Sequence, residues 1–222
     1  MPLDAVQVRV LGSLIEKEIT TPENYPLSLN ALMNACNQRS SRDPVLELTD
    51  DEIRQALHAL ENQDLITTVH DARVPKYEHR ARTILNLRRD ETAVLCLLML
   101  RGAQTPGELR GRSERLYAFD DISSVQSSLD RLASREASTE LANSGATGPL
   151  VAMLPRQPGS REARYTHLLS GTSEIPQTAS SSSIPCTPSL AERVTELESA
   201  LHHLNQTLAT LEARVQALES SS

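Results

Sequence analysis

The sequence predicts a mainly α-helical protein with small β hairpins, an α+β fold made of two similar units and followed by a long helix. Three observations lead to this prediction. Apolar residues recur at spacings of three and four in several short segments, as they do in amphipathic helices. A helix-then-hairpin pattern occurs twice along residues 1–170. A heptad of Leu and Val then fills the last part of the chain.

Composition limits the size of the cores and the classes of partner. The chain has 222 residues, of which 39% are hydrophobic and 2% are aromatic, so it can fill small helical cores better than one large core. A net charge of −7 argues against a general nucleic-acid coat. Residues 171–222 contribute −4 of that charge, which leaves the preceding part nearly balanced and allows local basic patches.

Cysteine use and hydropathy predict a cytoplasmic protein that does not enter a membrane. The three cysteines are widely spaced and form no C-x-x-C motif, and Cys36 and Cys96 fall on apolar helix faces, so we expect reduced core residues. No basic segment followed by an apolar block opens the chain. The longest apolar run, Ala93 to Leu100, is far shorter than the roughly 20 residues that span a bilayer.

The first unit begins with two predicted helices. One runs from about Asp4 to Lys17, and the other runs from Ser28 to about Cys36 with apolar residues on one face. Two X-Pro dipeptides separate these helices, and the residue before a proline avoids the helical region. A polar turn over residues 37–42 follows. The buried stripe of the first helix is predicted to comprise Leu3, Val6, Val10, Leu11 and Leu14.

A third helix and a hairpin complete this unit. Thr49 and Glu52 form a capping-box pattern, and Leu48 with Ile53 can form a hydrophobic staple around it, so the helix begins near Thr49. The segment 65–69 is predicted to pair with 74–77 through a turn at 70–73. Helix, helix, turn, helix and hairpin is the order of a winged helix-turn-helix unit.

The pattern recurs in the second half of the chain. The apolar spacing that starts at Ile53 is repeated from Val125, and the stretch Ala93 to Leu100 takes the place of the first helix. A second hairpin is predicted to pair 150–154 with 163–167. Two dipeptide matches support the repeat: Thr21-Pro22 with Thr105-Pro106, and Tyr77-x-His79 with Tyr165-x-His167. We therefore predict tandem winged helix-turn-helix domains over residues 1–88 and 89–170.

The remaining chain is predicted to be a linker and a coiled coil. Residues 171–188 are rich in Ser, Thr and Pro and show no burial pattern, which indicates a disordered linker. Residues 189–222 favour a parallel homodimer, although a trimer, an antiparallel pair and a single amphipathic helix packed on the domains remain open. The predicted interface residues are Leu190, Val194, Leu197, Leu201, Leu204, Leu208, Leu211, Val215 and Leu218.

The sequence offers little for catalysis. His70, Asp71 and His79 lie near one another, but they lack the spacing of strong metal sites. Asp50, Asp51 and Glu52 occur in the first turn of a helix, where acids favour the helix dipole. No glycine-rich phosphate loop or nucleophile motif is present. We therefore predict no enzymatic activity, no cofactor and no metal site.

Binding of double-stranded DNA is the first functional hypothesis, because a winged helix places its third helix in the major groove. The third helix of the second unit is polar to basic, and its wing is rich in arginine. The low aromatic content disfavours single-stranded nucleic acid. The candidate DNA-binding residues are Arg54, Gln55, Ser123, Ser124, Gln126, Ser127, Arg131, Arg156, Arg161 and Arg164.

The alternative hypothesis is a protein–protein interaction adaptor that does not bind DNA. Acidic tandem winged-helix proteins can hold protein partners on the same surfaces, as the ScpB subunit of bacterial condensin does. The net negative charge, the acidic start of the third helix and the predicted coiled coil favour this alternative. Fold class alone does not decide between the two.

Three blocks of sequence carry a family resemblance. They are IEKEITTPENYPLSLNALMNACNQRSSRDPVLEL, AVLCLLMLRGAQTPGELRGRSERLY and LPRQPGSREARYTHLL, which begin at Ile15, Ala93 and Leu154. With the segments between them, they resemble the YceH family of bacterial proteins over about residues 3–170. The resemblance implies a tandem winged-helix fold and carries no activity with it.

Overall fold

The computed structural model describes residues 2–70, 73–135, 148–155 and 162–171. The chain divides into two compact units, Met1–Thr178 and Ala179–Ser222, and every described residue belongs to the first. Both predicted domains fall inside this first unit, and their division at residue 88 stays a prediction. The predicted coiled coil and almost all of the predicted linker lie outside the described residues.

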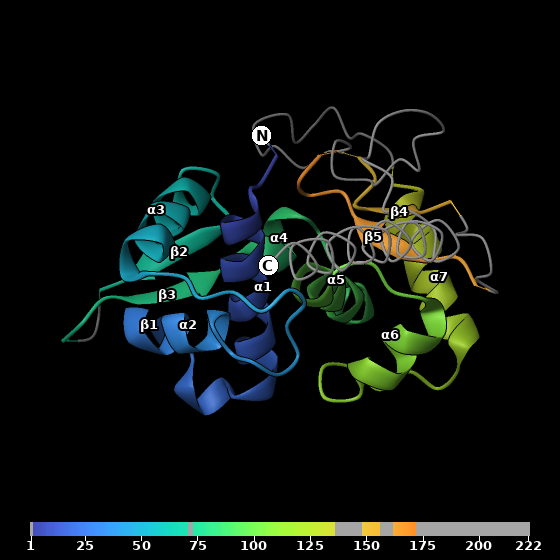
Figure 1. The fold of residues 1–222 in the computed structure, drawn as a ribbon, viewed down its shortest axis with the longest axis horizontal. Helices are drawn as coiled ribbons and strands as arrows, with labels where there is room; N and C mark the ends of the chain where they lie inside the picture. The colour runs from blue at the N-terminus through green and yellow to red at the C-terminus, as the bar shows by residue number, and fades with distance from the viewer. Residues whose placement is uncertain (1, 71–72, 136–147, 156–161, 172–222) are drawn as a thin grey trace, which may run out of the picture. The chain divides into compact units, whose positions relative to one another are not determined.

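The described part is a mixed fold of helices and two small antiparallel sheets (Figure 1). The first sheet has the strand order β1-β3-β2, and the second pairs β4 with β5. The elements of the first half are α1 (Ala5–Thr20), the 3-10 turn η1 (Pro22–Asn24), β1 (Leu27–Ser28), α2 (Leu29–Cys36), α3 (Asp50–Glu61), β2 (Ile66–Val69), β3 (Lys76–His79) and α4 (Ala81–Ile84). Those of the second half are α5 (Arg89–Arg101), α6 (Pro106–Ser113), α7 (Ile122–Ala133), β4 (Val151–Met153) and β5 (Tyr165–His167).

Capping explains where several helices begin. Thr49 and Glu52 exchange hydrogen bonds at the start of α3, which confirms the predicted capping box. Thr105 and Glu108 make the same reciprocal pair at the start of α6. Asp121 caps α7 by accepting from the backbone N–H of a residue in its first turn. Each cap satisfies N–H groups that the helix itself leaves without a partner.

The predicted stripe of α1 is confirmed at Leu3, Val10, Leu11 and Leu14, which are buried, and Val6 is half-buried. The sequence did not predict that the helix is buried on every side along its middle. All residues from Gln7 to Ile15 are buried, including Arg9 and Ser13. The helix packs against α2 and α3 on one side and against α5 on the other (Figure 1). At Gly12 an added Cβ would lie 3.0 Å from Leu100 Cδ2, so a larger residue would force the Leu100 side chain to shift, and the glycine allows this close approach to α5. One helix therefore belongs to the cores of both halves.

Both hairpins form close to the predicted positions. In the first, Ile66 pairs with His79 and Val69 pairs with Lys76, so the returning strand lies two residues later than expected. In the second, Val151 pairs with His167 and Met153 pairs with Tyr165, inside the predicted segments. The third helices also match, since their spaced apolar residues are buried: Ile53, Leu57 and Leu60 in α3, and Val125, Leu129 and Leu132 in α7.

Two tyrosines hold equivalent places in the two halves. Tyr77 of β3 pairs with Leu27 of β1, and Tyr165 of β5 forms an isolated bridge with Gln104. Each partner lies just before the second helix of its half. The predicted match between the Tyr-x-His motifs is confirmed.

The predicted match between the Thr-Pro dipeptides was wrong. Ser28 caps α2 and Thr105 caps α6, and each follows the residue that pairs with a tyrosine. Thr105 therefore corresponds to Ser28. Thr21 instead precedes η1 and makes no side-chain cap there. The sequence matched the shared dipeptide, which is a local signal, while the equivalence follows from strand pairing.

The connection from α2 to α3 is a long loop fastened by buried arginines. Arg42 is fully buried and donates to the Ala35 carbonyl and to both carboxylate oxygens of Glu16, at 3.2 and 2.6 Å. Arg9 donates to the Cys36 carbonyl and to the Pro44 carbonyl. These guanidiniums satisfy carbonyls at the end of α2 that have no partner within the helix.

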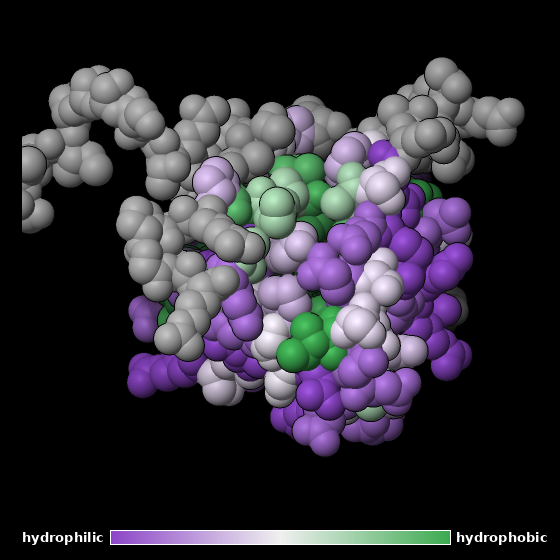
Figure 2. Space-filling view, turned by 90° about the vertical axis from the view of Figure 1, so that its right-hand side faces the viewer, coloured by the Kyte–Doolittle hydropathy of each residue, from purple (hydrophilic) through white to green (hydrophobic). Residues whose placement is uncertain are grey.

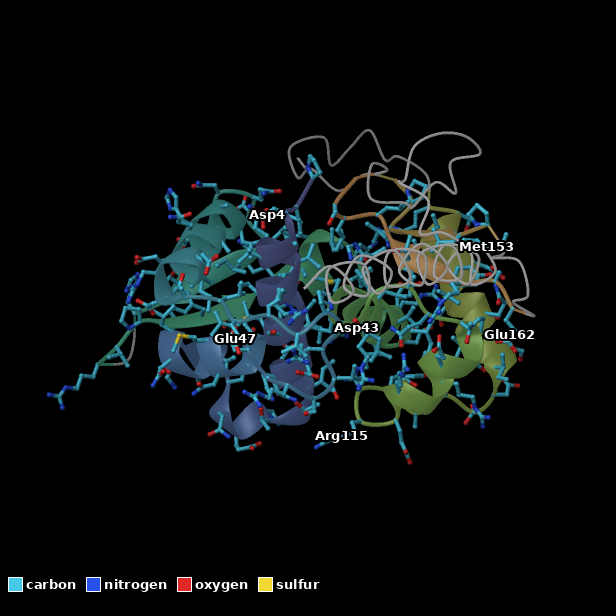
Figure 3. The ribbon with its side chains drawn as sticks, viewed as in Figure 1. Asp4, Asp43, Glu47, Arg115, Met153 and Glu162 are labelled. Carbon is cyan, nitrogen blue, oxygen red and sulfur yellow. The ribbon has the colours of Figure 1, made fainter. Side chains whose placement is uncertain are left out.

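The same loop also ties the two halves together. The Asp43 N–H donates to the Leu100 carbonyl at the end of α5, at 2.9 Å. Asn37 closes the loop, because its side chain exchanges hydrogen bonds with both backbone groups of Leu48. Asp43 and Glu47, labelled in Figure 3, both lie on this loop. The stretch predicted as a polar turn is therefore a structural clamp.

Replacing Arg42 tests this clamp. Arg42→Ala leaves the partly buried Glu16 carboxylate and the Ala35 carbonyl without a donor, and we expect it to lower the free energy of unfolding by about 3–5 kcal/mol. Urea denaturation followed by circular dichroism measures the loss. Arg54→Ala is the control, because the Arg54–Asp50 pair is exposed on both sides, and we expect no change in its urea midpoint. Equal midpoints for the two variants would contradict a structural role for Arg42.

Candidate functional site

The predicted DNA-contact residues of α3 lie on an acidic surface. Asp50, Asp51 and Glu52 fill the first turn of the helix. Arg54 is exposed and donates to Asp50 at 2.9 Å, and this hydrogen bond raises the pKa of Arg54. Gln55 is exposed as predicted. The one predicted cation of this helix is thus paired with a carboxylate of the same helix.

The polar residues of α7 are engaged with their own helix and with β5. Ser123 and Ser124 both donate to the Asp121 carboxylate, and Ser127 donates to the Ser123 carbonyl. Gln126 donates to the hydroxyl of a tyrosine in β5 at 2.7 Å. Figure 2 shows this side of the molecule as mostly hydrophilic, with apolar patches at the upper centre and in the middle, and Ile122 and Met153 are exposed apolar residues of the second half. The polar candidate side chains of α7 are at the surface, but each already has a partner.

The two described candidate arginines of the second half are held in ion pairs. Arg131 pairs with Glu91 at 3.0 Å and with Asp90, and the hydrogen bond to Glu91 raises its pKa. Arg164 pairs with Glu108 at 2.9 Å and also donates to a backbone carbonyl. Their charge is therefore largely neutralised where a DNA phosphate would need it. Arg156 and Arg161 lie outside the described residues.

An apolar groove lies beside the acidic start of α3. Its volume is about 490 Å³, and α2, α3 and the segment leading into β3 form its walls. Val74 is 55% exposed at its edge. The pairing of β3 with β1 places Tyr77 next to α2 and so closes one side. The residues that line the groove are Ser28, Leu29, Asn30, Asp50, Arg54, Val74, Pro75 and Tyr77.

Of the residues that line the apolar groove, sequence reasoning assigned only Arg54 to a site, as a DNA contact. It placed Leu29 on a core face and Val74 in a strand, whereas Leu29 is half-buried and Val74 precedes the strand. One signal could have pointed to the groove: Val74-Pro75 puts an apolar pair next to a predicted hairpin turn, where polar residues are usual. The groove itself depends on strand pairing and is not a local property.

His79 makes contacts that connect β3 to other elements of the fold. Its Nε2 lies 2.8 Å from Glu18 Oε2, and its backbone N–H donates to the Tyr25 hydroxyl at 2.6 Å. The hydrogen bond from His79 lowers the pKa of Glu18. Within the described residues, no three His, Cys, Asp or Glu side chains gather as they would around a metal ion. This pair fastens β3 to the end of α1.

Two of the cysteines are free and buried, as predicted. Burial raises the pKa of the Cys36 thiol to about 11, and it also raises the pKa of Cys96. Cys186 lies outside the described residues. Among the helices that the structure describes, none combines the length and the apolar composition needed to cross a lipid bilayer.

The described fold, with three helices before each antiparallel hairpin, is consistent with the winged-helix class. The family described as "Protein of unknown function, DUF480" matches residues 3–160. A UPF0502 protein of Koribacter versatilis is 49% identical over 203 residues, which cover 91% of this chain and 90% of the relative. A UPF0502 protein of Vibrio parahaemolyticus is 42% identical over 224 residues, with 98% of each chain covered. The chain belongs to this family, and the resemblance to the YceH family is thereby confirmed.

Proposed function

We propose that the described part of the chain forms two tandem winged-helix domains and that the protein acts as a protein–protein interaction adaptor in the cytoplasm, without catalysis. The repeated order of three helices and a hairpin supports the fold. The apolar groove with its acidic rim supports the function, and it is the observation that carries the proposal. It lies on the side of the first half that carries α3 and the first hairpin, where a DNA-binding winged helix would face its target.

Charge complementarity defines the partner. Leu29, Val74, Pro75 and Tyr77 offer apolar contact inside the groove. Asp50 lines the groove and is paired with Arg54, and Asp51 and Glu52 follow it in the acidic first turn of α3. A protein segment that alternates apolar and basic side chains matches both features. DNA does not, because its phosphates would meet the carboxylates.

DNA binding is the second candidate function, and the arginines of the second wing favour it. Arg156 and Arg161 stand in the sequence between β4 and β5, where a wing would contact the DNA backbone. Against it, the described arginines on the candidate list, Arg54, Arg131 and Arg164, are all paired with carboxylates. The geometry therefore favours the adaptor over the function that the sequence favoured.

Short fluorescein-labelled peptides test the adaptor proposal by anisotropy. We expect a peptide of alternating Leu and Arg to bind, while Ser/Arg and Leu/Glu peptides of equal length do not. Val74→Arg removes an apolar contact and adds repulsion, so it should weaken binding about tenfold or more, which corresponds to about 1.4 kcal/mol. Val45→Arg is the matched control, because Val45 is similarly exposed, at 49%, and lies outside the groove.

Two results would contradict the adaptor proposal. One is a failure of the Leu/Arg peptide to bind, or an equal loss in Val74→Arg and Val45→Arg. The other is micromolar binding of random-sequence duplex DNA that weakens steeply with salt and falls in the double variant Arg156→Ala/Arg161→Ala. That second result would establish the DNA-binding alternative.

We further propose that the heptad over residues 189–222 joins two chains as a homodimer. Leu or Val at every a and d position over four heptads supports it. We expect light scattering to give twice the chain mass of 24.4 kDa for the full protein and a monomer after truncation at Gly171. An unchanged oligomeric state after truncation would contradict the proposed heptad interface.

A further inference from the structure

A small cleft at the junction of the two halves is lined by an excess of positive charge. It has a volume of about 150 Å³ and lies between the end of α1, the α2–α3 loop and α6 with the turn after it. Figure 3 shows Arg115 at the lower edge of the molecule, between the end of α1 and that turn. The cations that line the cleft are Lys17, Arg101, Arg112 and Arg115.

Most of these cations have no carboxylate partner among the described residues. Lys17 donates to the amide oxygen of Gln38, and Arg101 donates to the Ser41 hydroxyl at 2.6 Å. Arg115 makes no hydrogen bond or ion pair with any described residue, and Arg112 pairs with Glu108 at 3.6 Å. The surplus of charge is therefore local, although the protein as a whole is acidic.

The carboxylate in the lining does not cancel this charge. Glu16 is the acid among the lining residues, and Arg42 occupies both of its oxygens. Burial lowers the pKa of Arg101, and the nearby positive charge of Arg112 lowers it further. Like charges held together in a partly desolvated cleft repel, and a bound anion would relieve that repulsion.

The cleft offers hydroxyl groups as well as charge. Ser40 and Ser41 line it from the loop, and Thr20 lines it from α1. Ser41 has φ 60°, a left-handed conformation that few non-glycine residues adopt, and its hydroxyl contacts Arg101. Guanidinium groups and hydroxyls together provide the donors that a phosphate group accepts.

A second groove adjoins the cleft and shares Lys17, Thr21 and Gln38 with it. It has a volume of about 520 Å³ and contains Lys76, so both lysines of the chain line these two neighbouring spaces. No carboxylate belongs to its lining among the described residues, while Asn24 and Asn34 supply amides. Such a wall suits the polar, hydroxyl-bearing part of a small molecule.

We propose that the cleft binds the phosphate group of a phosphorylated small molecule, whose polar remainder occupies the adjoining groove. Lys17, Arg101 and Arg115 contact the phosphate, with Ser40 and Ser41 as further donors. Lys76 contacts the remainder. The cleft shares no lining residue with the apolar groove, and the adjoining groove shares only Ser28 with it. The phosphate site is therefore independent of the adaptor proposal.

Isothermal titration calorimetry of the full chain tests this site. The probes are inorganic phosphate, glycerol 3-phosphate, glucose 6-phosphate and AMP, each at constant ionic strength set with chloride. We expect a phosphomonoester to bind and Arg115→Ala to weaken it about tenfold, the loss of one charged hydrogen bond. Arg39→Ala is the matched control: it removes the same charge from the neighbouring loop, is exposed and lies outside the cleft, so binding should not change.

Lys76→Gln distinguishes the two sources of phosphate. If an ester is the ligand, this variant weakens binding of the ester and leaves binding of inorganic phosphate unchanged, because Lys76 lines the adjoining groove. If inorganic phosphate binds as tightly as every ester and Lys76→Gln changes nothing, the ligand is free phosphate and the role of the groove is overturned. Absence of binding by all four probes, or an equal loss in Arg39→Ala and Arg115→Ala, would overturn the site itself.

Discussion

The close packing of α1 against α5 is the constraint on which the rest of the described structure depends. Gly12 lets the two helices approach until a Cβ would touch Leu100, and the Cys96 thiol donates to the Gly12 carbonyl across the contact. Since the other sides of α1 pack on α2 and α3, this helix is shared by two cores. The halves therefore hold each other in place, and grooves at their junction have defined walls.

At the α2–α3 loop, ion pairing removes charge that a ligand could otherwise contact. Arg42 and Glu16 neutralise each other inside, so neither contributes to the cation excess of the cleft beside them. Ion pairs on the second half, such as Arg131 with Glu91, likewise remove charge from the face that the sequence assigned to DNA. Three cations without carboxylate partners in the described residues, Lys17, Arg101 and Arg115, line one cleft. Pairing thus decides which of the many arginines are available to a ligand.

Features that depend on neighbours in sequence could be predicted, and features that depend on distant contacts could not. The capping box at Thr49 and the buried spacing of α3 are local signals, and both are confirmed. The burial of α1 on every side depends on a helix more than 70 residues away, so a single stripe was predicted instead. The partner of Arg131 is 40 residues distant in sequence, which made this arginine look available for DNA. For the same reason the grooves were missed, because each is walled by segments that strand and loop pairing bring together.

Hydrogen exchange in increasing urea, read by mass spectrometry, tests the shared core most directly. If α1 serves both halves, amides of α3 and α7 should open in one transition, with the same free energy and the same dependence on urea. If α3 exchanges at a lower free energy and with a smaller urea dependence while α7 stays protected, the halves unfold separately. That result would contradict a common core built around α1.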